Sequence, residues 1–108
     1  MHMLLIEGNP KGNREEFLTV FSNEILPTLK KQSGFVDEIL LLGDEPNQAV
    51  GLSFWKTKED AKRYQSQVFP QQVDKVKDVL DGVPRVRDFT VASSETFNIA
   101  IPTIPKAA

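Results

Sequence analysis

Two runs of strand-forming residues flank a short turn in the middle of the chain, and this arrangement restricts the fold more than any other feature. The runs span residues 35–42 and 48–56, and the turn-forming sequence GDEPN separates them at positions 43–47. Five turn-forming residues between two strands predict a hairpin. The two strands should therefore be antiparallel neighbours.

A helix is predicted before this hairpin. It should begin after Asn13, a good N-cap residue, with Glu16 in the capping-box position, and it should end at Gly34. Pro27 should bend it near its end, because proline lacks the backbone N–H that a helix interior requires. Its buried face is formed by apolar residues at steps of three and four, namely Phe17, Val20, Phe21, Ile25 and Leu29.

A second helix is predicted after the hairpin. Thr57 should cap it, with Asp60 three positions later, and Pro70 should divide it into two segments. It should end at Asp81-Gly82. Its apolar face contains Ala61, Tyr64, Val68, Val73, Val76 and Leu80.

Two further strands complete the pattern, at residues 3–7 and 83–92. The order strand, helix, strand, strand, helix, strand is that of the ferredoxin-like α+β fold. This fold is a four-stranded antiparallel sheet with two helices on one face. We predict a single domain over residues 1–98, followed by a C-terminal tail over residues 99–108.

The predicted sheet has apolar residues on both faces. Residues 39–42 (ILLL) and 4–6 (LLI) do not alternate with polar residues, although two helices can cover only one face. Exposing several large aliphatic side chains would cost about 1.5–3 kcal/mol each and would favour aggregation. We therefore expect a homodimer in which the open sheet faces of two copies pack together.

Composition excludes several classes of function. The formal net charge of −2 gives no basic surface for nucleic acid, and no apolar run is long enough to span a membrane. The absence of cysteine excludes disulfides and thiolate metal sites. The only histidine, His2, is interpreted as incidental, so no metal site is predicted. A cytoplasmic location is the expectation.

The strand at residues 48–56 carries a second clue. Ala49, Gly51, Ser53 and Trp55 share one face. A row of small side chains that ends in a tryptophan fits either close helix packing or a pocket between sheet and helices. Tyr64, two turns into the following helix, should face the same space. Trp55 and Tyr64 either flank a pocket or fill a core.

Several of these features together resemble a known family. The Gly34-Phe35 pair, the hairpin and the sequence GLSFWKTKEDA at positions 51–61 resemble antibiotic biosynthesis monooxygenase-like (ABM) domains of the dimeric α+β barrel superfamily. The resemblance covers roughly residues 3–95. It implies a homodimer whose sheets form a barrel, with a pocket between sheet and helices in each subunit.

The resemblance also implies an activity. Some ABM proteins are oxygenases that oxidise aromatic polyketides or quinols without metal or flavin, so no cofactor is expected. Trp55 matches a tryptophan that lines their pocket, whereas Gly51 stands where they carry an asparagine. Arg85 and Arg87 would hold an anionic substrate, or else they are surface residues of an edge strand. Glu7, Asp37 and Glu38 are possible general bases, and no catalytic residue is assigned.

Haem-degrading relatives share a motif around Val68-Phe69. However, their histidine, tryptophan and asparagine positions fall near Val73, Tyr64 and Glu7 here, and the second helix has no imidazole to ligate haem iron. The candidate pocket residues are Trp55, Tyr64, Gly51, Ser53, Phe69, Arg85 and Arg87. The leading hypothesis is a cofactor-independent monooxygenase acting on a small aromatic or quinol, and the alternative is a non-catalytic domain that binds a small hydrophobic ligand.

Overall fold

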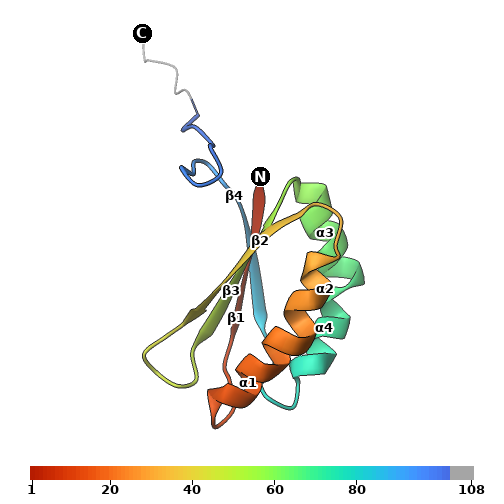
Figure 1. Cartoon of the computed structure of the whole chain (residues 1–108), viewed down its shortest axis with the longest axis vertical. Helices are drawn as coiled ribbons and strands as arrows, with labels where there is room; N and C mark the ends of the chain where they lie inside the picture. The colour runs from red at the N-terminus through yellow and green to blue at the C-terminus, as the bar shows by residue number, and fades with distance from the viewer. Residues whose placement is uncertain (103–108) are drawn as a thin grey trace.

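The computed structural model describes residues 1–102 and has the predicted ferredoxin-like order. Its sheet contains four antiparallel strands in the order β2-β3-β1-β4. The strands are β1 (His2–Gly8), β2 (Phe35–Leu42), β3 (Ala49–Trp55) and β4 (Arg85–Thr90). Within residues 1–102 all helices lie on one face of this sheet, and no helix covers the other face (Figure 1). The end of the predicted tail, residues 103–108, lies outside the described residues.

The first helical region has three parts: α1 (Arg14–Val20), the π-helical segment η1 (Phe21–Ile25) and α2 (Leu26–Lys30). The Asn13 side chain caps α1 and accepts a hydrogen bond from the backbone N–H of Glu15. The Leu26 N–H bonds to the Phe21 carbonyl, five residues back. Pro27 follows in the first turn of α2. The sequence predicts a bend caused by Pro27. The structure instead has a π-helical turn just before this proline.

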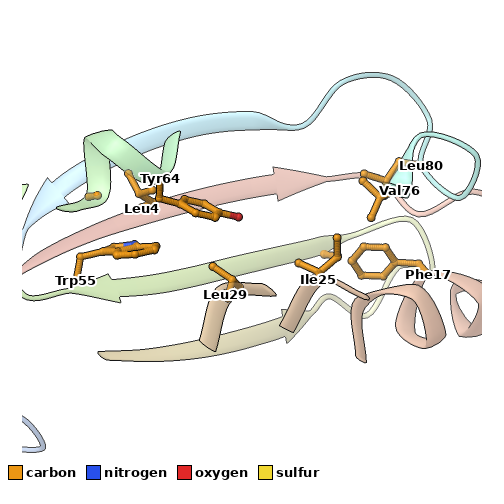
Figure 2. Close-up of a cluster of buried hydrophobic side chains, with 10 residues drawn as sticks. Leu4, Phe17, Ile25, Leu29, Trp55, Tyr64, Val76 and Leu80 are labelled. Carbon is orange, nitrogen blue, oxygen red and sulfur yellow. The ribbon is translucent and has the colours of Figure 1, made fainter. Parts of the chain in front are cut away.

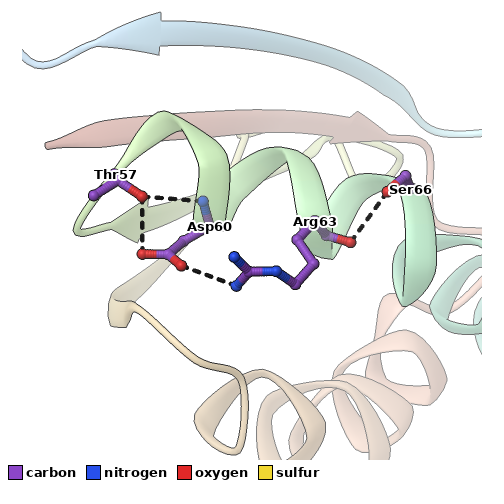
Figure 3. Close-up of polar contacts among 4 residues, drawn as sticks. All are labelled: Thr57, Asp60, Arg63 and Ser66. Carbon is purple, nitrogen blue, oxygen red and sulfur yellow. Dashed lines mark hydrogen bonds and ion pairs between the residues drawn. The ribbon is translucent and has the colours of Figure 1, made fainter.

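The second helical region is divided as predicted. Its segments are α3 (Lys58–Gln67) and α4 (Phe69–Val76), with Pro70 in the first turn of α4. Figure 3 shows the cap of α3, in which the Thr57 hydroxyl donates to Asp60 Oδ2 (2.9 Å) and accepts from the Asp60 N–H (3.1 Å). The bond from the Thr57 hydroxyl, together with the Arg63 guanidinium, holds the pKa of the Asp60 carboxyl below its usual value. No helix in residues 1–102 is long and apolar enough to cross a membrane.

The hydrophobic core lies between the sheet and the helices (Figure 2). Leu4 of β1 and Trp55 of β3 are almost completely buried in it. The helices contribute Phe17, Ile25 and Leu29 from the first region and Ala61, Tyr64 and Val76 from the second. Both helical regions therefore bury one apolar stripe against the same sheet face, which fixes the space between them.

The opposite sheet face is apolar at its centre. The register places Ile39, Leu52 and Leu5 in one row across β2, β3 and β1. Ile39 is 40% exposed and Leu41, further along β2, is 48% exposed. Phe54, also on this face, packs on Phe97 at 5.3 Å between ring centroids. Apolar residues therefore occupy both faces of the sheet, as the sequence predicts.

His2 has a structural role, which corrects its interpretation as incidental. It is the first residue of β1 and is only 5% exposed. Its Nε2 lies 2.8 Å from Asp88 Oδ2 on β4. This hydrogen bond lowers the pKa of the Asp88 carboxyl and ties the two strands together near the start of the chain.

Candidate functional site

A cavity of about 70 Å³ lies between the sheet and the helices. On the sheet side its lining comes from all three strands nearest the helices: Ile6, Gly8, Glu38, Leu40, Ala49, Gly51 and Ser53. On the helix side it is lined by Phe17, Phe21, Ile25, Leu29, Tyr64, Phe69, Gln72, Val73 and Val76, and the segment between α4 and β4 adds Leu80 and Pro84. The walls are mostly apolar, and four side chains carry polar atoms. This composition is typical of small-molecule sites.

A β-bulge in β2 brings Glu38 into this cavity. Phe35 pairs with Trp55 and Asp37 with Phe54, so β2 has one more residue than β3 over this stretch. Because side chains alternate along a strand, unbroken pairing from Phe35 would place Asp37 on the side of Trp55. The extra residue reverses the face to which each following side chain of β2 points. Glu38 therefore lies opposite Ser53, on the helix side. Bulges commonly redirect a side chain in this way.

One oxygen of the Glu38 carboxyl group is buried without a partner in residues 1–102. This atom is Oε2, and no residue of the described part of the chain hydrogen-bonds it. Burial, with a smaller contribution from the negative charge of Asp37, raises the pKa of Glu38 to about 8. A β-carbon at Gly51 would lie 3.0 Å from Glu38 Oε1. Gly51 therefore leaves the space that this carboxyl group occupies.

Tyr64 is the second polar group of the cavity. Its ring stacks on Trp55 with centroids 4.9 Å apart and an interplanar angle of 28°. Figure 2 shows its hydroxyl pointing away from Trp55, toward the end of the core that contains Phe17 and Val76. Burial raises the pKa of Tyr64 to about 12, and the nearby Glu38 contributes to this rise. The hydroxyl therefore keeps its proton at neutral pH and is a hydrogen-bond donor.

Gln72 is another polar side chain of the cavity, and it connects the two helical regions. It is 3% exposed, and its Nε2 donates to the Ile25 carbonyl at the end of η1 (3.1 Å). Lys75 Nζ donates to its Oε1 (3.4 Å) and to Thr28 Oγ1 (3.3 Å). The Gln72 side chain also lies near the Tyr64 hydroxyl and opposes part of the rise of its pKa. Gln72 therefore connects the two helical regions beside Tyr64.

Four of the predicted pocket residues line the cavity, namely Gly51, Ser53, Tyr64 and Phe69. Trp55 lies behind Tyr64 and is completely buried. Its indole Nε1–H donates to Ser53 Oγ (2.9 Å), so one acceptor position of the Ser53 hydroxyl is used by the core. Trp55 is thus part of the core and supports the cavity wall through its stack on Tyr64.

Arg85 and Arg87 do not line this cavity. Their register opposite Glu7 and Leu5 places them on the open sheet face, away from the helices. Arg85 pairs there with Glu7, with 2.8 Å between Nη2 and Oε1. Of the two alternatives for these arginines, the structure supports surface residues of an edge strand. An anionic substrate inside the cavity would not reach either guanidinium.

Sequence reasoning did not select Glu38 or Gln72 as site residues. Glu38 was one of three acidic residues that the strand pattern could not separate, and the bulge that separates them has no strong signal in the sequence. Gln72 lies between Val68 and Val76, which are spaced four residues from it on the apolar face of the helix. A polar residue on an apolar stripe is a signal that this side chain has a buried partner.

No group of three or more histidine, aspartate or glutamate side chains is arranged to hold a metal ion within residues 1–102. The polar groups of the cavity are one carboxyl, one phenol, one amide and one hydroxyl. Proton transfer and hydrogen bonding to a neutral aromatic ligand are the chemistry that these groups supply.

The sequence matches no described protein family, and it matches no curated protein. Solved structures do match. SnoaB, a cofactor-independent oxygenase from Streptomyces nogalater, superposes with a TM-score of 0.73 and 21% identity, covering 87% of this chain and 95% of SnoaB. A "putative antibiotic biosynthesis monooxygenase" from Nitrosomonas europaea gives 0.70 at 16% identity, covering 86% of this chain and 100% of its own. A protein of the same description from Deinococcus radiodurans gives 0.70 at 10% identity, covering 97% of this chain and 100% of its own.

These likenesses define the class of fold. The chain has the ferredoxin-like α+β fold of the ABM proteins, as its sequence resemblance implies. At these identities the likeness establishes the fold alone, and activity has to be argued from the cavity itself.

Proposed function

We propose that this protein is a cofactor-independent oxygenase that acts on a small phenol or quinol in the cavity between sheet and helices. The observation that carries the proposal is the Glu38 carboxyl group, whose Oε2 atom is buried without a hydrogen-bond partner in a mostly apolar cavity. A carboxyl group in this setting costs stability, and groups with strongly shifted pKa values are concentrated at functional sites. Its raised pKa of about 8 suits a general base that works near neutral or mildly alkaline pH.

The proposed reaction begins with proton transfer from the substrate hydroxyl to ionised Glu38. The resulting phenolate is electron-rich and reduces O₂, and a new C–O bond forms at a ring carbon. Glu38 returns its proton to the peroxide, which gives a hydroperoxide on that carbon. The Glu38 carboxylate then takes the hydrogen of the same carbon as a proton, and the C=O bond of the quinone forms as the O–O bond breaks. The departing hydroxide takes this second proton from Glu38 and leaves as water. The substrate supplies both electron pairs, so O₂ is the only other reactant.

Tyr64 would stabilise the phenolate. Its hydroxyl is neutral below about pH 12 and points into the core, so it can donate a hydrogen bond to a developing negative charge. The apolar walls would exclude water from the anion, which strengthens this hydrogen bond. Trp55 would act as a positioning residue through its stack on the Tyr64 ring, and Gln72 through its place near the Tyr64 hydroxyl.

The size of the cavity restricts the substrate. Its 70 Å³ is smaller than the roughly 150 Å³ cavity that binds benzene in another protein. A single ring would enter only if side chains such as Phe69 shift outward, and a fused polycyclic substrate would need a larger rearrangement. Because the space is so nearly filled, the small volume also favours the alternative function, a domain that binds a small hydrophobic ligand without catalysis.

Oxygen uptake tests the proposal. A panel of single-ring phenols and quinols should quench or shift the fluorescence of Trp55, the only tryptophan, and should start oxygen consumption. We expect the rate to rise with pH through about 8, as Glu38 ionises. Glu38→Gln should lower the rate at least about 100-fold, the usual effect of losing a general base. The matched control, Glu7→Gln, removes an acid on the opposite sheet face and should keep the activity.

Binding without oxygen uptake across the panel would contradict the oxygenase and support the non-catalytic alternative. Equal rates for the wild type and Glu38→Gln would show that oxidation occurs without this carboxyl group. Either result can be read directly, because the fluorescence titration shows whether the ligand has bound.

We further propose that the protein is a homodimer in which the open sheet faces of two copies pack together. The row of Ile39, Leu52 and Leu5 supports this, because its side chains have no helix above them. Covering exposed apolar area contributes about 25 cal/mol per Å². A second copy of the same sheet is the simplest complementary surface, since a two-fold axis places this row against itself.

Light scattering after size-exclusion chromatography tests the dimer. We expect the wild type to elute as a dimer and Leu52→Glu to dissociate at least about thirtyfold more readily, since it places two unpaired charges at the centre of the interface. Val83→Glu is the matched control, because Val83 is 75% exposed and lies outside the strands. A wild type that stays monomeric at high concentration would rule out the interface.

A further inference from the structure

The charges around the cavity are unbalanced. Glu38 is the only acid in its lining, and the lining contains no lysine, arginine or histidine. Lys75, which does not line the cavity, donates its ammonium group to Gln72 Oε1 and Thr28 Oγ1. When Glu38 is ionised, the cavity therefore holds one negative charge, and no cation stands in the lining that residues 1–102 provide.

Aromatic rings form much of the opposite wall. Phe17 and Phe21 contact each other with centroids 6.0 Å apart, and Tyr64 and Phe69 do so at 6.3 Å. The faces of such rings attract organic cations, and the attraction strengthens when water is excluded. A buried carboxylate among aromatic rings is a combination that recognises an ammonium group attached to an apolar body.

We propose that this cavity is also a binding site for small protonated amines, with the ammonium group against Glu38 and the apolar part among the aromatic rings. Such an amine would occupy the same space as a phenol and would compete with it. The inference goes beyond the proposed oxygenase and does not require any catalytic activity, because it rests only on the unpartnered Oε2 atom and the composition of the walls.

Few groups around Glu38 would interfere with this pairing. Asp37, the neighbouring acid on β2, faces the other side of the sheet opposite Phe54 and would add a favourable negative charge. From β3 the carboxyl group meets Gly51 and Ser53, which carry no charge. Tyr64 from α3 remains neutral. An incoming ammonium group would therefore have no competing cation to displace.

Benzylamine and benzyl alcohol form a matched pair for the test, because they share the ring and differ in charge. Trp55 fluorescence would follow binding of each at pH 6 and pH 8.5, under nitrogen to prevent oxidation. The ionised fraction of Glu38 rises about 75-fold between these pH values, and we expect the affinity for benzylamine to rise by a similar factor. The affinity for benzyl alcohol should stay within about twofold, because its binding needs no carboxylate.

Calorimetry adds a second signature. At pH 6.5 most Glu38 is protonated, so binding of benzylamine should release about one proton, measured by comparing buffers with different ionisation enthalpies. Benzyl alcohol should release none. A release near zero for benzylamine would overturn the proposal, and so would equal pH dependence of the two ligands.

Two variants identify the residue. Glu38→Gln should remove the preference for the amine at pH 8.5 and keep the binding of benzyl alcohol, which also shows that the variant is folded. Asp37→Asn should shift the rise in benzylamine affinity to lower pH, since it removes a charge that raises the pKa of Glu38. An unchanged amine preference in Glu38→Gln would contradict the assignment. Because no oxygen is consumed in these measurements, their outcome is separate from that of the oxygenase test.

Discussion

Glu38→Gln should be more stable than the wild type at pH 9, by on the order of 4 kcal/mol in the free energy of unfolding. The cause is the raised pKa of Glu38, about 8 in the folded protein against an ordinary value of 4.5. Between these two pH values the folded state binds a proton that the unfolded state has released. The wild type therefore loses stability as the pH rises through this range, and the loss is complete above about pH 8.

Glutamine cannot ionise, so the variant should not show this loss. Urea denaturation followed by circular dichroism at pH 4 and pH 9 would measure the difference, with the two proteins nearly equal at pH 4. Glu7→Gln is the control, because Glu7 lies half-exposed on the other face and pairs with Arg85. If the wild type were as stable at pH 9 as at pH 4, the Glu38 carboxyl group would have to be solvated or paired in the folded protein.

Trp55→Ala should destabilise the protein by about 3–5 kcal/mol, the range found when a large buried aromatic side chain is removed. Trp55 has no exposed surface and contacts two other rings: Tyr64, stacked at 4.9 Å, and Phe35, edge-on at 5.7 Å. Its removal also leaves Ser53 without the indole donor. The variant should therefore lose packing, two aromatic contacts and a buried hydrogen bond together.

Urea denaturation at pH 7 would measure this loss, with circular dichroism as the signal because the variant has no tryptophan. Val83→Ala is the control. Val83 is 75% exposed, and its truncation should change stability by no more than about 0.5 kcal/mol. A Trp55→Ala variant as stable as this control would mean that the tryptophan is not a core residue and that the stack on Tyr64 contributes little.

Local signals in the sequence predicted most of the fold correctly. The hairpin, the Thr57 cap and the division at Pro70 each depend on a few neighbouring residues whose conformational preferences are strong. The small residues on one face of β3 were also predicted, since alternation along a regular strand is dependable. The π-helical turn was not predicted, because a shift from four- to five-residue hydrogen bonding needs only a small change in backbone geometry.

The candidate site was less predictable for a related reason. Arg85 and Arg87 were considered as pocket residues because their strand was recognised but its register against β1 was not. Glu38 stayed undecided among three acids, since its direction depends on the pairing of β2 with β3. Register and bulges are set by contacts between distant segments, and a single sequence does not reveal them.

The extra residue in β2 has a consequence for how such proteins diversify. Two adjacent acids, Asp37 and Glu38, stand on opposite sides of a thin layer, and the count of residues before them decides which one enters the interior. Inserting or losing one amino acid in this strand would exchange an interior acid for a surface one with little change in composition. Two related proteins that differ by a one-residue gap in this strand would therefore differ in the acid that faces the cavity. A comparison that counts only identical residues would overlook this difference.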